Sequence, residues 1–162
     1  MRILLAVVAL HCAGIPLLPV TAQAPTWSPE QQAVWAVVEQ SWKDEVARNG
    51  KWPSSYTDPN MTAWGPEWPM PRNAASVERW TRFQDKQGKS LEYEIQPMAI
   101  AISGNTAVVN YASVNMWQRE IPRGETPPKP DRDTTALSET LVRTAAGWKF
   151  LGSTTFPLND DD

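Results

Sequence analysis

Two carboxylates of the sequence are candidates for acid–base chemistry, and the first is Asp58. It follows Tyr56 and precedes Pro59, in a segment too rich in proline for a long regular element. A carboxylate that faces an apolar pocket has a raised pKa and can act as a general base. Asp58 is therefore a candidate catalytic residue, with Tyr56 as a candidate ligand contact. The alternative is a turn, in which the Asp58 carboxylate accepts hydrogen bonds from Asn60 or Met61.

The second carboxylate, Glu139, belongs to an otherwise apolar or hydroxyl-bearing strand predicted over residues 136–142. Alternation puts it on the same face as Leu137 and Leu141. It therefore points either into the core or onto an outer face that a partner covers. A buried acid must be paired or protonated, which makes Glu139 the second candidate catalytic residue. A solvated charge at the edge of the sheet is the alternative.

Two tyrosines lie on the apolar side of other predicted strands. Tyr93 shares a face with Ile95, and Tyr111 shares a face with Val109. Either phenol could donate a hydrogen bond to a ligand oxygen or to a developing oxyanion, so both are candidate ligand-binding residues. Buried tyrosines also serve as core or interface residues with a satisfied hydroxyl, and that alternative stays open.

Tryptophan is unusually frequent, with nine residues against three phenylalanines and three tyrosines. Trp64 and Trp68 lie in the proline-rich segment and could stack on a flat apolar or sugar-like ligand. The alternative is a small local core that ties this segment to the first helix. Trp80 completes the predicted ligand-binding set, although its place on an apolar helix face favours a core role.

The first 22 residues are typical of a secretion signal that is removed. Arg2 precedes a long apolar run, and small residues favour cleavage after Ala22. We therefore expect an exported protein, periplasmic or secreted, with no stable membrane anchor. The alternatives are acylation at Cys12 and a retained anchor, against which Pro16 and Pro19 argue because they interrupt the run.

Removal of this segment takes away the only histidine and the only cysteine, His11 and Cys12. The mature chain then has no thiol for a disulfide, no Cys/His zinc site and no His-dependent nucleophile. Acid–base chemistry must rest on Asp, Glu, Tyr or Lys, and we expect neither a metal nor a cofactor. Loss of Arg2 takes the formal net charge from -3 to -4. Such a balance argues against nucleic acid as a partner, because phosphate binding needs a cationic surface.

The length of 162 residues suits one domain, predicted over residues 23–158 and followed by an acidic tail at 159–162. Ser28 is a suitable N-cap for a first helix that ends near residues 49–50. Asp44 is expected on the solvated side of this helix. The apolar stripe of the helix runs through Trp35, Val38, Trp42 and Val46.

A second helix is predicted between an N-cap at Asn73 and a stop at Gly88. The chain then alternates as strands do, with a bulge expected at Pro97. Residues 119–133 are rich in proline and charge and are predicted to connect two strands, as a lid or as a plain connection. Four strands are predicted, over residues 91–102, 107–118, 136–144 and 148–156. The result is an α+β domain with helices packed on one face of an antiparallel sheet.

Several short motifs follow one another in a familiar order and spacing. The two most diagnostic are Ile-x-Ile-x-Gly-x-x-Ala-Val, which begins at Ile100, and the late Gly147-Trp148-Lys149. Tyr-Thr-Asp at 56–58 and Thr-Ala-Trp at 62–64 precede them. Over residues 28–156 the chain resembles the SnoaL-like branch of the nuclear transport factor 2-like superfamily.

This resemblance implies a strongly curved antiparallel sheet wrapped into a cone around the N-terminal helices, with a pocket at one end. Asp58 would lie near its mouth. Relatives include isomerases, cyclases, dehydratases, hydrolases and binding or assembly domains, so the fold does not fix the chemistry. We expect an exported protein that binds a small apolar or aromatic molecule in a largely apolar pocket, with no turnover assigned to it. The alternatives are a cofactor-free enzyme with a carboxylate base and a homodimeric assembly module. A homodimer through the outer sheet face is expected in either case.

Overall fold

The computed structural model describes residues 26–158, so the predicted signal peptide and acidic tail lie outside the described residues. Within this range, none of the helices combines the length and apolar character needed to cross a membrane. The elements follow the predicted α+β order. They are α1 (Pro29–Val46), β1 (Thr57–Trp64), β2 (Arg72–Asn73), α2 (Ala74–Gln87), β3 (Gly88–Ser103), β4 (Thr106–Arg119), β5 (Asp131–Thr144) and β6 (Gly147–Pro157).

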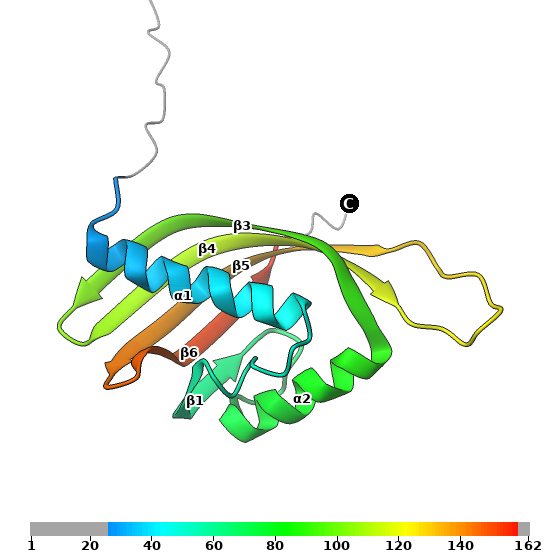
Figure 1. Ribbon diagram of the computed structural model, residues 1–162, viewed down its shortest axis with the longest axis horizontal. Coiled ribbons are helices and arrows are strands. Elements are labelled where there is room, and N and C mark those ends of the chain that lie inside the picture. Colours follow the sequence, from blue (N-terminus) through cyan, green and yellow to red (C-terminus); the bar gives the residue numbers. More distant parts are fainter. Residues whose placement is uncertain (1–25, 159–162) are drawn as a thin grey trace, which may run out of the picture.

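All six strands form one sheet in the order β2-β1-β6-β5-β4-β3. The antiparallel meander predicted from β3 to β6 is confirmed. The sheet also includes β1, which pairs with β6 in parallel and extends the meander on one side. Figure 1 shows the long strands curving around α1, with α2 at the end where β3 begins. This curvature makes the concave face that holds the candidate site.

The cap of α1 agrees with its prediction. The Ser28 hydroxyl accepts a hydrogen bond from the backbone N–H of Gln31 at 3.2 Å, and the Gln31 side chain accepts from the Ser28 N–H at 2.8 Å. This reciprocal pair satisfies two of the N–H groups that a helix start leaves free. The helix ends at Val46, slightly earlier than predicted, and Arg48 turns the chain in the left-handed region with φ 49°.

The start and end of α2 and the bulge in β3 are also confirmed. The Asn73 side chain accepts from the Ser76 N–H at 2.9 Å, as an N-cap does. Gly88 ends the helix in extended backbone and lies against the ring of Trp117, where a Cβ would come within 2.1 Å of a ring carbon. The β3–β4 register shifts after Pro97, because proline cannot donate to the ladder.

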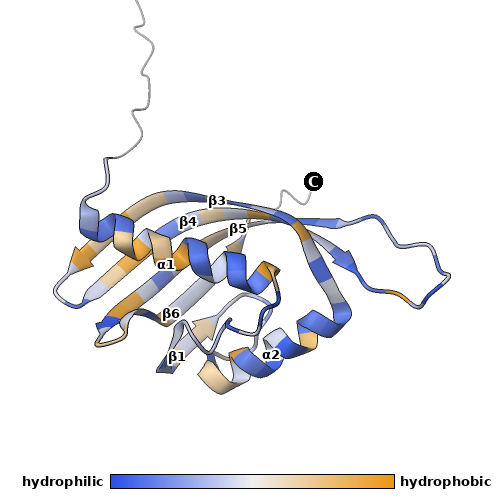
Figure 2. Ribbon diagram, in the orientation of Figure 1, coloured by the Kyte–Doolittle hydropathy of each residue, from blue (hydrophilic) through white to orange (hydrophobic). Residues whose placement is uncertain are grey.

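The hydrophobic core lies between α1 and the concave side of the sheet. Val34 and Val38 of α1 are completely buried against it. Every second residue of β4 faces the same way, so Tyr111 is also buried. Figure 2 shows the apolar stretches of α1 and of the neighbouring strands on the side where they meet. The other buried core residues are Met61, Ala63, Val77, Ile100, Ala107, Val109, Leu141, Trp148 and Phe150.

The connection between β4 and β5 is shorter than predicted, because both strands continue into the segment assigned to it. Their pairing reaches Trp117 opposite Asp131. Alternation fails to reveal these residues since this end of the ladder lies beyond the core. It extends past the body of the domain in Figure 1 and is largely hydrophilic in Figure 2.

Candidate functional site

A cavity of about 430 Å³ opens between the C-terminal half of α1, the segment after β1 and the concave side of the sheet. Trp42 and Glu45 reach it from α1, and Gln84 reaches it from α2. Apolar and polar side chains both line it, whereas the sequence analysis predicts a largely apolar pocket. The remaining lining residues are Gly65, Pro66, Glu67, Trp68, Ser113, Asn115, Asp133, Thr135, Leu137, Thr155 and Pro157.

Cross-strand pairing builds the floor of this cavity. Ser113 of β4 lies opposite Thr135 of β5, and Leu137 of β5 lies opposite Thr155 of β6. Directly opposed residues of antiparallel strands point to the same face of a sheet. Two adjacent rows of the ladder therefore present three hydroxyls and one leucine to the cavity.

Glu45 is the titratable group best placed inside the cavity. Water reaches its side chain through the opening, yet the surrounding protein and the nearby carboxylate of Asp85 disfavour its charged form. Desolvation of the carboxylate by the surrounding protein is the larger cause and repulsion by Asp85 the smaller, and together they raise the pKa of Glu45 to about 7. A carboxylate with this pKa is suited to accept and return protons near neutral pH.

Glu139 lies deeper, one row below the floor. It is 5% exposed and lies opposite Val109 on one side and Ser153 on the other. Burial raises its pKa to about 8, against a smaller lowering by hydrogen bonding from Tyr111 and Ser153. Its Oε2 atom has no hydrogen-bond partner among residues 26–158. At neutral pH the carboxyl is therefore mostly protonated and can donate a hydrogen bond.

Tyr111 connects this buried acid to the wall of the cavity. The Trp42 Nε1–H donates to the Tyr111 hydroxyl oxygen at 3.0 Å. This leaves the Tyr111 proton free to be donated onward, and burial followed by the Glu139 charge holds the pKa of Tyr111 well above its usual value. Tyr111 is thus hydrogen-bonded to Trp42 at the cavity wall and lies close enough to the buried Glu139 for their charges to interact.

A smaller hollow of about 180 Å³ adjoins the cavity, and Glu45, Gln84 and Asn115 line both. Arg48 lines the smaller one and forms ion pairs with Asp85 at 3.8 Å and Glu120 at 3.2 Å. Two buried atoms here, Arg48 Nη2 and Asn115 Oδ1, have no hydrogen-bond partner within the described part of the chain. Over the same residues, no group of three or more His, Cys, Asp or Glu side chains could hold a metal ion.

A third hollow, a groove of about 540 Å³, lies outside the cone along α2. Arg72 lies between the rings of Trp68 and Trp80, 4.3 Å from each ring centroid. Arg79 and Phe83 also line the groove. Its size exceeds that of the inner cavity, but it contains no carboxylate, so acid–base chemistry belongs to the inner one.

The sequence matches no protein-family model, and comparison with curated proteins also finds no match. Solved structures do match. A nuclear transport factor 2-like superfamily protein from Salmonella enterica has a TM-score of 0.64 at 13% identity, over 82% of this chain and 93% of that chain. A ketosteroid isomerase-like protein from Erwinia carotovora atroseptica has a TM-score of 0.67 at 11% identity, over 82% and 99%. The CaMKII hub of S. rosetta has a TM-score of 0.62 at 18% identity, over 82% and 99%.

The chain has the nuclear transport factor 2-like fold. The similarity to these structures extends over nearly all of the described residues, as the motif-based resemblance implies. At such low identities the similarity shows the fold and carries no residue roles, so the site rests on the geometry of this chain.

In this fold the candidate base Asp58 lies outside the cavity. Its Oδ1 accepts from the backbone N–H of Asn60 at 2.9 Å and from the Asn60 side chain at 3.1 Å. This is the turn arrangement named as its alternative, and Asp58 does not line the 430 Å³ cavity. The position agrees with a turn role, because the carboxylate is used locally within β1.

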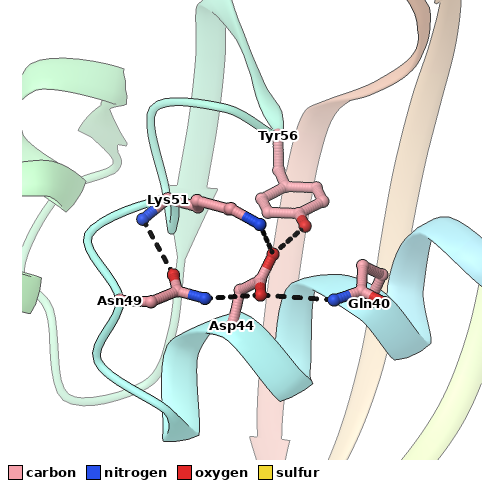
Figure 3. Close-up of polar contacts among 5 residues, drawn as sticks. All are labelled: Gln40, Asp44, Asn49, Lys51 and Tyr56. Carbon is pink, nitrogen blue, oxygen red and sulfur yellow. Dashed lines mark hydrogen bonds and ion pairs between the residues drawn. The ribbon is translucent and has the colours of Figure 1, made fainter.

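Tyr56 also lies apart from the cavity lining, because its hydroxyl donates to Asp44. Asp44 was expected on the solvated side of α1, and that expectation is wrong: it is 5% exposed. Figure 3 shows Tyr56, Asn49, Gln40 and Lys51 converging on its carboxylate. The hydrogen bonds from Tyr56 and then Asn49 hold the pKa of Asp44 below its ordinary value of 3.8. These contacts compensate for its burial, and they tie the chain after α1 to the helix.

The predicted aromatic residues divide among the hollows. Trp68 lines both the cavity and the outer groove. Trp80 lines the outer groove and the small hollow. Trp64 is 54% exposed, lines none of the three hollows and donates its Nε1–H to the Trp68 carbonyl at 3.1 Å. Tyr93 stacks on Trp42 at 5.6 Å between centroids and thereby supports the cavity wall.

Glu45 is the residue that the sequence analysis missed. It follows Trp42 by three positions and Val38 by seven, so it lies on the apolar stripe of the helix. An acid inside such a stripe is the signal that could have identified it. The carboxylates that the fold brings to the cavity are Glu45, Glu67 and Asp133, and Asp58 is not among them.

Proposed function

We propose that this chain is an exported small-molecule-binding protein of the SnoaL-like branch, with its ligand in the 430 Å³ cavity. The observation that carries the proposal is the position of Glu45 inside this cavity, with a pKa raised to about 7. A carboxylate in such a place lowers the stability of the free protein. Its presence there is therefore a mark of a functional site. The order of SnoaL-like motifs supports the branch, and the N-terminal 22 residues support export.

The lining supports a ligand that is partly apolar and partly hydrogen-bonding. Trp42, Trp68 and Leu137 supply apolar surface, while Ser113 and Asn115 supply polar atoms. Small-molecule sites commonly combine a mainly apolar wall with a few polar groups that fix orientation. The volume suits a molecule of moderate size, since ligand pockets begin at roughly 300 Å³.

A native mass spectrum of the mature protein, purified from its own host compartment, tests this proposal. We expect a retained small-molecule mass, because the cavity is open to solvent but walled on several sides. Thr135→Trp fills the cavity from its floor and is expected to abolish the retained mass. Thr106→Trp is the matched control, since Thr106 is exposed at the turn between β3 and β4, and it is expected to keep the ligand. An empty wild-type protein, or equal retention by both variants, would contradict the proposal.

The same preparation tests the homodimer that we propose through the outer sheet face. Val114 points away from the cavity, opposite in direction to its neighbours Ser113 and Asn115. The CaMKII hub of S. rosetta, whose structure is similar to this chain, supports an assembly role for the fold. We expect twice the chain mass by light scattering, reduced to a monomer by Val114→Arg. Thr126→Arg, at an exposed position of the connection between β4 and β5, is expected to leave the dimer intact. A monomeric wild-type protein would refute the dimer without affecting the ligand proposal.

A second candidate function is a cofactor-free proton-transfer enzyme that uses Glu45 as its base. It is favoured by one specific observation, the pair of carboxyls with raised pKa values in one connected region. Glu45, near 7, is suited to accept a proton, and Glu139, near 8, is suited to donate a hydrogen bond. Glu45 also contributes to the raised pKa of Glu139, so the two groups are electrostatically coupled.

A further inference from the structure

The charged side chains around the cavity are all of one sign. Glu45 reaches it from α1, Glu67 from the segment after β1, and Asp133 from β5. No lysine or arginine is among its lining residues within the described chain. Water reaches all three carboxylates. A ligand that enters the cavity therefore meets three carboxylates on its lining.

The aromatic walls of the cavity suit the same sign of ligand charge. Trp42 and Trp68 are the two tryptophans that line it. Indole faces attract cations through the ring quadrupole. The chain already uses Trp68 in this way on its outer side, where the Arg72 guanidinium lies 4.3 Å from the ring centroid.

An independent observation concerns hydrogen-bond donors. Asn115 Oδ1 is buried, lines the cavity and has no donor among residues 26–158. An acceptor left without a partner in this way destabilises the folded protein by an amount that a ligand N–H would recover. The carboxylates are likewise acceptors only when ionised. A ligand with N–H donors would satisfy these acceptors.

We infer that the ligand of this cavity is an organic cation, a protonated amine carried on a flat apolar body. This inference rests on the proposed function and specifies its substrate class. The ammonium group is placed toward Glu45 and Asn115, and the apolar body lies along Trp42 and Trp68.

The two cations that line the adjoining hollow do not cancel this preference. Arg48 and Lys89 line only the adjoining hollow, and Arg48 is already paired with Asp85 and Glu120. Asp85 repels a second negative charge in this region, as its effect on Glu45 shows. The local field therefore disfavours anionic ligands.

Three probes of nearly the same shape and different charge test the inference: benzylammonium, benzyl alcohol and benzoate. Titrations followed by protein NMR at about pH 8, above the pKa of Glu45 near 7, keep Glu45 ionised. We expect benzylammonium to bind at least about tenfold more tightly than benzyl alcohol, and benzoate to bind most weakly. Binding is expected to change the chemical shifts of the indole N–H signals of Trp42 and Trp68.

Two variants separate the cavity charge from the overall charge of the protein. Glu45→Gln is expected to weaken benzylammonium binding about tenfold and to leave benzyl alcohol unchanged. Glu125→Gln removes the same charge from an exposed position of the connection between β4 and β5 and is expected to change neither affinity. Equal weakening by both variants would mean that net charge alone attracts the probe, and would overturn the inference.

Tighter binding of benzyl alcohol or benzoate than of benzylammonium would also overturn it, while supporting the proposed function. Failure of all three probes overturns it as well. In that case the native mass spectrum decides separately whether any small molecule occupies the cavity.

Discussion

If Glu45 serves as the base of a proton-transfer enzyme, a ligand recovered from the cavity is expected to exchange a carbon-bound hydrogen for deuterium when the protein is present in D₂O. Glu45→Gln is then expected to slow this exchange by about 10²- to 10⁴-fold. Glutamine has nearly the shape of glutamate but cannot accept the proton. The effect is large because Glu45, with a pKa of about 7, is the carboxylate inside the cavity that is best matched to proton transfer at neutral pH. Proton NMR of the ligand measures the loss of signal directly.

Asp58→Asn is the matched control, because Asp58 is the base that the sequence predicts and its carboxylate serves as a turn acceptor. This variant is expected to exchange at the wild-type rate. The opposite result, with exchange lost in Asp58→Asn and retained in Glu45→Gln, would restore the sequence-based assignment. Absence of exchange in the wild-type protein would leave binding without turnover as the function.

Local sequence signals predicted most of the fold because each acts over a few residues. Ser28 and Asn73 cap helices through their own side chains, and the shift after Pro97 follows from a missing N–H. Alternation also identified Tyr111 as inward-facing. The place of β1 could not be predicted in this way. Its parallel pairing with β6 joins segments far apart in the sequence, and no local pattern encodes it.

The candidate site was harder to predict, since it depends on polar residues that the fold buries. Alternation related Glu139 to Leu141 but could not choose between the two faces of the sheet; burial in the core decides it. On α1 the buried side includes Ser41 and Asp44, which an apolar pattern assigns to solvent. The burial of the Asp44 carboxylate is compensated by a hydrogen bond from Tyr56, which lies beyond the end of the helix. Such partners become visible only when the chain is folded.

The unfolding free energy of the wild-type protein is expected to fall as the pH rises, because of Glu139. Glu139→Gln is expected to abolish this decrease. The pKa of Glu139 is about 8 in the folded protein against an ordinary value of 4.5. Between these values the folded state keeps a proton that the unfolded chain has released, so rising pH favours unfolding. The favourable contribution is complete below about pH 4.5 and is lost progressively up to about pH 8. The pKa difference corresponds to at most about 5 kcal/mol of unfolding free energy.

The upper part of this pH range isolates Glu139 from the other groups. Glu45 also lowers the unfolding free energy as the pH rises, but its effect is complete at a lower pH because its pKa in the folded protein is about 7. Asp44 has a lowered pKa, so its effect lies below 3.8, where protonation removes its stabilising contribution. Between about pH 7 and pH 9 we therefore expect the wild-type protein to lose about 1 kcal/mol through Glu139.

Urea unfolding of both proteins at about pH 5, 7 and 9 measures this difference. The amide introduced by Glu139→Gln keeps the volume of the acid and can still accept from Ser153, so the variant is expected to fold. Its stability relative to the wild-type protein is expected to increase with pH and to be greatest at pH 9. Glu125→Gln, at an exposed position of the connection between β4 and β5, controls for the change in net charge and is expected to follow the wild-type curve. If the unfolding free energy of Glu139→Gln instead changed with pH in parallel with that of the wild-type protein, Glu139 would already be ionised at neutral pH. Its role as a neutral hydrogen-bond donor beneath the cavity would then be untenable, because an ionised carboxylate has no proton to donate.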